Sequence, residues 1–382
     1  MNLVEPQERP EDHVMKLGVP TKFHRKVGMT NRFAIGLAVV TLTCSLSFIA
    51  LSHPEAVSTR QQNQSVREII PDDYVRTCHR RHEDGSRALL PEKYLTMNDC
   101  KKRLPDVVVL GTKKCGTGAL RVFLDTHPSV VFSKKAEAKF FTQNYKKGLD
   151  WYVQIMRPTA TGQVGMEKSP GYFFSSEAAR RIKSDLPETT KFIVILCNPV
   201  RRTISEFTFE QLNKIKDKFQ VDTEEAKVIA KRTFNSSKFE KYITTSSGRI
   251  RTNVDIITHS MYDKYILSWL KLFSRSRFLF VDGDNFTHNP VTVLNEIEQF
   301  IDVPRYFNSS RFYFDKEKGF FCLSEPFKQC LRSTKGLEHP PVDRTVLRKL
   351  RELFKAHDFA TSILTLKNFT WMKNDYGTKV QP

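Results

Sequence analysis

Residues 106–121, DVVVLGTKKCGTGALR, contain the pattern that determines the fold. Four apolar residues in a row, at 107–110, are typical of a strand buried on both faces, and this run ends at Gly111. A helical pattern follows at 119–126 and stops before Pro128. A strand, a glycine-containing turn and a helix in this order present backbone N–H groups and a helix N-terminus to an anion. Because the turn lacks the GxxxxGK(S/T) spacing, a Mg²⁺-dependent nucleoside-triphosphate hydrolase is disfavoured.

Two more apolar runs, at 191–196 and 278–281, predict further buried strands. A helical pattern begins near Pro199, after the first of these runs, and continues to about residue 212. Apolar residues at helical spacing between 262 and 273 predict a helix packed on the core. Strands that alternate with helices indicate an α/β fold, so we predict a central, mostly parallel sheet covered by helices on both faces.

The composition indicates a folded protein with an anionic partner. The chain has 382 residues, of which 40% are hydrophobic and 27% charged, as in globular proteins. The formal net charge is +19, which favours binding to a nucleic acid, a sulfated sugar or an acidic membrane surface. The same composition excludes an acidic solvating protein and a membrane protein with several spans.

The N-terminal region predicts a membrane anchor. Residues 33–51 are uncharged and are long enough to cross a bilayer as a helix. Arg25, Lys26 and Arg32 precede this segment, so the positive-inside rule places the N-terminus in the cytosol. A cleaved signal peptide and a buried core helix are the less favoured alternatives. We therefore expect a cytosolic tail (1–32), a transmembrane signal anchor (33–51), a stem (52–104) and a lumenal domain (105–382).

Glycosylation sequons agree with this topology. All five follow the predicted span, as a lumenal domain requires, and they begin at Asn63, Asn235, Asn285, Asn308 and Asn368. A lumenal location makes nucleic acid an improbable partner in spite of the charge. Glycosaminoglycans and acidic membrane surfaces remain as candidates.

The cysteines also suit an oxidising compartment, since the chain has seven of them. Cys322 and Cys330 are close in sequence, with Pro326 between them, and this spacing suits a hairpin closed by a disulfide. Cys78 and Cys100 are candidates to pair with each other near the start of the lumenal domain.

Charged segments follow several of the predicted strands. The segment 134–141, KKAEAKFF, places a carboxylate, Glu137, among three lysines, although a solvated surface charge would have the same pattern. The segment 167–172, EKSPGY, follows another short strand, and the segment 197–202, CNPVRR, follows the strand at 191–196. Ligands of open α/β sheets bind outside the carboxyl ends of the strands, so we expect these segments to converge there.

With these segments in place, the chain resembles the heparan sulfate glucosamine 3-O-sulfotransferase family. The resemblance extends over about 105–371 and rests on seven motifs in the family's order: KKCGTGAL, EAKFF, EKSPGYF, NPVRRTISEFT, VDGD, KGFFCL…C and KGLEHPPVD. It implies a single sulfotransferase domain with a P-loop-like phosphosulfate loop, in a type II protein of the Golgi membrane. The implied donor is 3′-phosphoadenosine 5′-phosphosulfate (PAPS), the acceptor is the 3-hydroxyl of a glucosamine in heparan sulfate, and no metal is required.

The resemblance assigns catalytic roles to three residues. Lys114 corresponds to the loop lysine that stabilises charge on the leaving phosphate. Glu137 corresponds to the general base that takes the proton from the sugar hydroxyl, and neighbouring lysines would favour its charged form. Lys168 corresponds to a lysine of the substrate cleft that steadies this base.

The resemblance also implies the binding residues and one disulfide. The donor-binding positions are Lys114, Cys115, Gly116, Thr117, Gly118, Cys197, Ser205, Phe321, Lys335, Gly336, Leu337, Glu338 and His339. The substrate-binding positions are Lys134, Lys135, Glu137, Lys139, Lys168, Ser169, Pro170 and Gly171. Cys322 and Cys330 correspond to the family's disulfide.

Several positions depart from the family pattern. They are Cys115 in place of a glycine, Gly118, Cys197 and Leu337 in place of arginines, Lys139 in place of a histidine, Thr142 in place of an acidic residue, and Phe321 in place of a tyrosine. Each lost arginine–phosphate hydrogen bond would cost about 1.5–3 kcal/mol of binding free energy. Arg201 and Arg202 are candidates to compensate at the 3′-phosphate.

Two of these departures are cysteines at positions that contact the donor in the family. The simpler interpretation treats Cys115 and Cys197 as independent substitutions, in which each thiol fills a small space. The alternative is that the two thiols approach closely enough to oxidise, which would occlude the donor site and make activity depend on redox conditions.

The predicted function is therefore sulfuryl transfer from PAPS to heparan sulfate, with two alternatives. One is a catalytically impaired relative that binds heparan sulfate through the same cleft. The other is a sulfotransferase that acts on another glycosaminoglycan position. The sequence does not fix the preferred sulfation pattern, the occupied sequons or the oligomeric state.

Overall fold

The computed structural model of the chain describes residues 76–82, 86–233, 236–331, 339 and 341–376. The chain divides into two compact units, 1–68 and 69–382, and every described residue belongs to the second. The predicted anchor at 33–51 and two sequons, at Asn63 and Asn235, lie outside the described residues. In the part of the chain that is described, no helix is both long and apolar enough for a membrane span.

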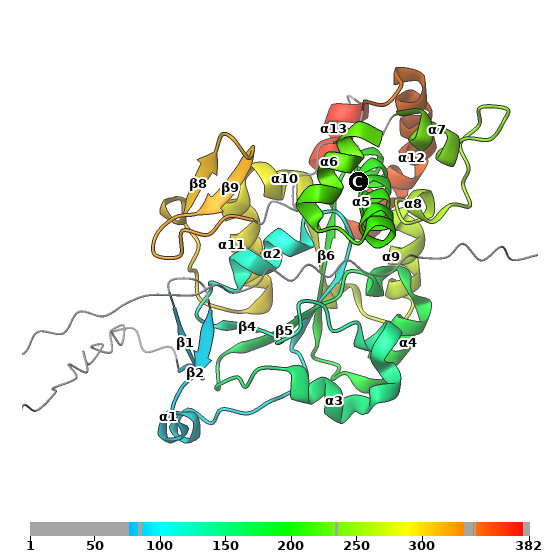
Figure 1. Cartoon of the computed structure of the whole chain (residues 1–382). Coiled ribbons are helices and arrows are strands. Elements are labelled where there is room, and N and C mark those ends of the chain that lie inside the picture. Colours follow the sequence, from blue (N-terminus) through cyan, green and yellow to red (C-terminus); the bar gives the residue numbers. More distant parts are fainter. Residues whose placement is uncertain (1–75, 83–85, 234–235, 332–338, 340, 377–382) are drawn as a thin grey trace, which may run out of the picture. The chain divides into compact units, whose positions relative to one another are not determined.

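A five-stranded sheet forms the centre of the described unit (Figure 1). All neighbouring strands are parallel, and their order across the sheet is β4-β5-β3-β6-β7. The predicted parallel α/β sheet is therefore confirmed. The strands are β3 (Val107–Gly111), β4 (Val130–Phe132), β5 (Val164–Lys168), β6 (Lys191–Leu196) and β7 (Phe278–Asp282).

Helices cover both faces of this sheet. Along β3, Val107 and Val109 pack into the cluster that includes α2 (Thr117–Leu124) and α11 (Pro290–Ile301). The alternate residue Val108 packs into the opposite cluster. That second cluster includes α3 (Gly148–Ile155), α4 (Ser176–Asp185) and α9 (Tyr262–Leu270). The strand is apolar throughout because both of its faces are buried, which is the reason for its uninterrupted valine run.

The remaining elements are connected around this core. They are β1 (His79–Arg81), β2 (Arg87–Leu89), α1 (Glu92–Met97), η1 (Phe140–Asn144), η2 (Tyr145–Lys147), η3 (Tyr172–Phe174), α5 (Pro199–Phe219), α6 (Thr223–Thr233), α7 (Ser236–Ile243), α8 (Asp255–Thr258), η4 (Arg275–Arg277), α10 (Gly283–His288), η5 (Ser309–Arg311), β8 (Phe312–Asp315), β9 (Phe320–Leu323), α12 (Arg344–Thr365) and α13 (Thr370–Tyr376). A third apolar cluster joins α5, α7, α8 and α12.

Three boundaries differ from those expected from the sequence. Helix α2 begins at Thr117, two residues before the predicted start at 119, because Gly116 caps it with a φ of 97°, which favours glycine. Helix α5 continues to Phe219, well past the expected end near 212. The segment expected to be a stem contains β1, β2 and α1, and the Cys78–Cys100 disulfide is formed there.

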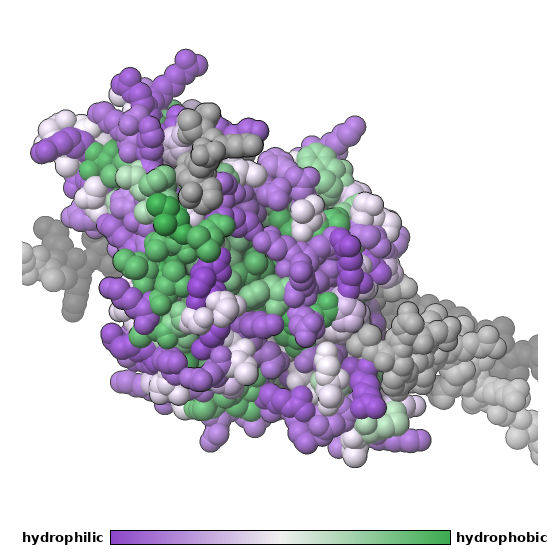
Figure 2. Space-filling model, turned by 180° about the vertical axis from the view of Figure 1, so that it is seen from behind, coloured by the Kyte–Doolittle hydropathy of each residue, from purple (hydrophilic) through white to green (hydrophobic). Residues whose placement is uncertain are grey.

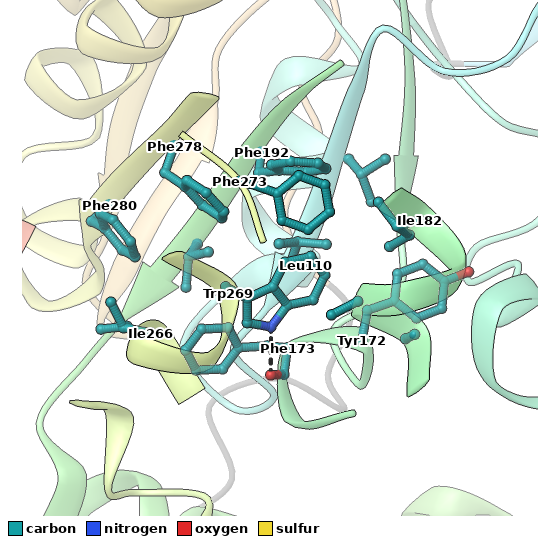
Figure 3. Close-up of a cluster of buried hydrophobic side chains, with 14 of the residues drawn as sticks. Leu110, Tyr172, Phe173, Ile182, Phe192, Ile266, Trp269, Phe273, Phe278 and Phe280 are labelled. Carbon is teal, nitrogen blue, oxygen red and sulfur yellow. Dashed lines mark hydrogen bonds between the residues drawn. The ribbon is translucent and has the colours of Figure 1, made fainter. Parts of the chain in front are cut away.

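Aromatic side chains dominate the cluster on the α9 face (Figure 3). Trp269 is 2% exposed, and its ring lies 5.5 Å from that of Phe273 and 5.8 Å from that of Phe192, centroid to centroid. Its indole N–H donates to the Phe173 carbonyl at 2.9 Å, the dashed contact in Figure 3. This bond joins α9 to the segment that follows β5, so it supports one wall of the strand-end region. The rear face in Figure 2 also carries an area of gathered apolar side chains between hydrophilic ones.

We expect Trp269→Phe to lower the free energy of unfolding by about 1–3 kcal/mol, because the buried Phe173 carbonyl then loses its donor. Urea unfolding at neutral pH measures this change. The matched control is Leu267→Ala on the same helix, where the side chain is 47% exposed and the expected change stays within about 0.5 kcal/mol. Equal losses in the two variants would contradict the role of the indole bond.

Candidate active site

A cavity of about 860 Å³ lies at the carboxyl ends of the central strands. Its walls come from the segments that follow β3, β5, β6 and β7, together with one face of α5. This placement confirms the expectation that the charged segments converge at one edge of the sheet. Among the predicted site residues, the following line it: Lys114, Cys115, Gly116, Thr117, Gly118, Glu137, Lys139, Ser169, Pro170, Gly171, Cys197, Ser205, Phe321 and His339.

The turn between β3 and α2 lines one part of the cavity and has the geometry of an anion-binding turn. Gly116 caps α2, and the space that a side chain would occupy there has no atom nearer than 3.7 Å. The first N–H groups of α2 have no partner within their own helix, so they are available to an anion. Lys114 adds a positive charge, and its Nζ lies 4.3 Å from the centre of the Phe209 ring.

Glu137 lines the cavity beside the segment that follows β5. Its carboxylate is 35% exposed and accepts a hydrogen bond from Lys168 Nζ at 2.8 Å. Lys168 itself is only 7% exposed, so its ammonium is held in one place. Glu137 is therefore a partly exposed carboxylate held by an ion pair, and not an isolated surface charge. Lys134 and Lys135 are exposed and do not line the cavity, in contrast to Lys139.

One face of α5 forms a further wall. Arg201, Ser205, Phe209 and Asn213 all line the cavity and recur every four residues, which places them on one side of a helix. Arg201 and Ser205 were expected from the sequence, whereas Phe209 and Asn213 were not. The same four-residue spacing predicts Phe209 within the expected helix and Asn213 one residue past its expected end near 212.

The two arginines after β6 have different environments. Arg202 is 0% exposed, and its guanidinium donates to the Ser260 hydroxyl, the Glu206 carboxylate and the Ile256 carbonyl. The guanidinium N–H groups of Arg202 are therefore bonded to acceptors of the protein itself. Arg201 is 46% exposed on its side chain and pairs with the Asp284 carboxylate at the edge of the cavity. Both arginines line the cavity, but Arg201 is the more exposed one and has the guanidinium that is better placed to contact a ligand.

A buried acid balances the inner charges of this wall. Glu206 contacts Arg202, and Lys113 Nζ lies 3.0 Å from its carboxylate. Burial alone would raise the pKa of Glu206, but the nearby His259 ring, at 3.7 Å, and the charges of Arg202 and Lys113 together hold that pKa well below its usual range. The acid therefore stays ionised and fixes the base of the β3–α2 turn.

Cys115 and Cys197 are joined by a disulfide, with Cα atoms 5.3 Å apart. The simpler interpretation of two independent thiols is wrong, and the alternative of a close approach is confirmed. The bond connects the turn after β3 with the end of β6, and both cysteines line the cavity. The volume of about 860 Å³ remains with the bond formed, so the disulfide is part of the cavity floor.

The last wall is formed by residues that follow β7, in α10. Gly283 packs so closely that an added Cβ would lie 2.8 Å from the Leu196 carbonyl oxygen and 2.9 Å from that of Cys115. Phe286 of α10, which the sequence analysis missed, also lines the cavity. The predicted donor residues Lys335, Gly336, Leu337 and Glu338 lie outside the described residues.

Cys322 and Cys330 form the expected disulfide, with Cα atoms 4.6 Å apart. The bond closes a tight turn that follows β9, and the Leu323 N–H donates to the Gln329 carbonyl at 2.9 Å just inside it, as expected for a hairpin closed by a disulfide.

We expect Cys197→Ser to lower the free energy of unfolding by about 4 kcal/mol, because the lost bond closes a loop with a sequence separation of 82 residues. Chemical denaturation of oxidised protein measures the loss, and peptide mapping without reductant checks the link. Cys115→Ser should lower the free energy of unfolding by the same amount. The double variant should lower it no further than either single variant, because all three remove the same bond. Additive losses would contradict a shared disulfide.

Comparison with known proteins places this chain among sulfotransferases. A family model described as "Sulfotransferase domain" matches residues 104–357. Heparan sulfate glucosamine 3-O-sulfotransferase 3A1 of Homo sapiens is 36% identical over 283 residues, which cover 72% of this chain and 64% of that protein. The human 3B1 protein is 37% identical over 276 residues, 71% of this chain and 65% of that protein. Heparan sulfate glucosamine 3-O-sulfotransferase 5 of Homo sapiens is 31% identical over 285 residues, 73% of this chain and 78% of that protein. The chain thus spans just under two thirds of the length of the first two relatives.

Proposed function

We propose that this chain transfers a sulfuryl group from PAPS to the 3-hydroxyl of glucosamine units in heparan sulfate. The premise is that the chain belongs to the heparan sulfate glucosamine 3-O-sulfotransferase family. The observation that carries the proposal is Glu137, which is held by Lys168 at 2.8 Å and lines the same cavity as the turn that opens α2. A base and an anion-binding site that share one cavity are what an in-line transfer to a hydroxyl requires.

The residues present fit a nucleotide with phosphate groups at both ends. The N-terminus of α2 and Lys114 would hold the 5′-phosphosulfate, and Ser205 and Arg201 would hold the 3′-phosphate. Arg201 then takes the place of the arginine that the family pattern has at Cys197. Bound there, the donor supplies an activated sulfuryl group.

The chain's own residues supply the acid–base and electrostatic chemistry. Glu137 accepts the proton of the sugar hydroxyl as the oxygen forms its bond to sulfur and the bond from sulfur to the phosphate oxygen breaks. Lys114 and the N-terminus of α2 stabilise the negative charge that grows on the departing phosphate. Lys168 orients Glu137 through their ion pair, but it is only 7% exposed and does not itself line the cavity.

We expect Glu137→Gln to lower kcat by about 10²–10⁴-fold, the usual contribution of a positioned general base. Donor and acceptor binding should stay nearly unchanged, because the amide keeps the size of the side chain. Transfer of radiolabel from PAPS to heparan sulfate, followed by mapping of the labelled position, measures turnover. Glu177→Gln is the matched control, since this carboxylate is exposed on α4 and pairs with arginines there. Turnover of Glu137→Gln within a few-fold of the wild type would remove Glu137 from the mechanism.

We expect Lys114→Ala to weaken donor binding and to lower kcat, because its charge faces a phosphate in the ground state and more charge in the transition state. Calorimetry with the desulfated donor nucleotide and turnover assays measure the two effects separately. Lys183→Ala, a change at a half-exposed lysine of α4, is the control. A variant with altered acceptor affinity alone would contradict the assigned role.

A binding protein without transferase activity is the second candidate. The observation that favours it is the Cys115–Cys197 disulfide, which stands where the family pattern has a glycine and a phosphate-binding arginine. Donor binding separates the two functions, since both require the sugar cleft but only the enzyme requires PAPS. The joint presence of Lys114, Glu137 and Lys168 favours the enzyme.

For the chain's location we infer a type II protein of the Golgi membrane, anchored by residues 33–51. The basic flank of that segment, the sequons after it and the three disulfides of the described unit support this topology. Asn308 and Asn368 are exposed, as glycosylation requires, whereas Asn285 lies half-buried in α10.

A further inference from the structure

The loop that carries Glu137 has no regular structure of its own. It connects β4, which ends at Phe132, to η1, which begins at Phe140. Lys139, at its end, has a left-handed backbone with a φ of 49°, which is uncommon for a residue other than glycine. Side chains from elsewhere in the fold must therefore hold this loop in place.

The first half of the loop is held by α2. Arg121 donates to the carbonyls of Ser133, Lys135 and Ala136 at 2.7–2.9 Å. One guanidinium thus fixes three of the four residues that precede Glu137. This contact makes the loop follow the helix whose N-terminus forms the anion-binding turn.

Three consecutive residues at the end of β5, 167–169, hold the second half of the loop. The Ala138 N–H donates to Glu167 Oε1 at 3.2 Å, and the Lys139 N–H donates to the Ser169 hydroxyl oxygen at 2.9 Å. The Ser169 hydroxyl in turn donates to the same Glu167 oxygen at 2.6 Å. With the Lys168–Glu137 pair, three consecutive residues of one segment contact three consecutive residues of the other.

Glu167 is the centre of this network and is itself 0% exposed. The charged and titratable groups that face it are Lys168 beside it, Arg121 of α2, the Tyr152 hydroxyl of α3, which donates to Oε2 at 3.4 Å, and Tyr172 of η3. Burial raises the pKa of Glu167 to about 7, against the opposing effects of Ser169, the Ala138 N–H, Lys168 and Arg121. A carboxylate accepts these hydrogen bonds more strongly than a protonated acid does.

We propose that Glu167 is a positioning residue for the transfer reaction, which fixes Glu137 toward the acceptor by holding the loop at Ala138 and Lys139. The inference rests on the proposed function, in which Glu137 is the base. Glu167 does not line the cavity, so it acts through the loop and not on the substrates. Its ionised form is the one that holds the loop.

The sign of the pH dependence follows from this assignment. Below about pH 7 the acid is protonated, the hydrogen bonds from Ala138 and Ser169 weaken, and Glu137 is less well oriented. The wild-type kcat should therefore fall as the pH decreases through about 7, with little change in the KM for the donor. Stability changes in the opposite sense, because a carboxylate whose pKa is raised by burial destabilises the fold once it is ionised.

The test compares kcat of Glu167→Gln with that of the wild type between about pH 5.5 and 8.5, because Glu167 titrates roughly within this range. The amide keeps an oxygen acceptor for Ala138 and Ser169 but does not titrate, so the decrease of kcat below about pH 7 should disappear. Turnover at pH 8 should fall several-fold, while the melting temperature stays equal or rises. Glu167→Ala removes the acceptor and should lower kcat by about 10–100-fold with the donor KM unchanged.

Asp358→Asn is the matched control. Asp358 is 1% exposed on α12, its pKa is also raised to about 7 by burial, and it accepts a bond from the Tyr376 hydroxyl, but it does not line the cavity. This variant should keep the wild-type pH profile of kcat. If Glu167→Gln keeps that profile too, the inference is overturned.

Glu137→Gln, assayed in parallel, separates this result from the proposed function. Wild-type turnover in Glu137→Gln overturns the assigned base together with the inference that depends on it. Slow turnover in Glu137→Gln, combined with an unchanged pH profile in Glu167→Gln, overturns the role of Glu167 alone.

Discussion

Thr112 donates two hydrogen bonds to the Ile195 carbonyl, one from its backbone N–H at 2.8 Å and one from its hydroxyl at 2.9 Å. Thr112 is the first residue after β3, and Ile195 lies near the end of β6, so these bonds join two parallel strands where both stop. The anion-binding turn, the cap of α2 and the start of α5 are all positioned from this junction. Because parallel strands end at the same edge, one buried contact sets the distance between the parts of the site.

Charge in the site is arranged in two layers. The inner layer is the buried pair of Arg202 and Glu206, and the partly exposed Lys113 of the β3–α2 turn contacts Glu206 from above at 3.0 Å. The outer layer, which includes Arg201 and Glu137, is partly exposed and faces the cavity. Unpaired charge buried beneath the site would be costly, so the pairing of the inner layer is what allows the outer charges to serve a ligand.

The sequence predicted the sheet and the edge at which the charged segments converge, because valine-rich runs and strand-end motifs are local signals. The run at 107–110 and the position of Lys114 needed no knowledge of distant residues. The role of Glu167 could not be predicted in this way, since a glutamate next to a lysine gives no sign of burial or of contact with a loop about thirty residues away. The Cys115–Cys197 bond was only one of two interpretations, because the distance between two loops depends on the register of β3 and β6.

That disulfide also has a consequence for how a bound nucleotide could leave. In many α/β proteins the loops after adjacent strands can separate slightly to admit and release a ligand. Here a covalent bond joins the loop after β3 to the end of β6, and Gly283 packs against the same junction. This side of the cavity is therefore rigid. Any widening of the cavity must then come from lining segments that this bond does not join, such as the one that contains Phe321.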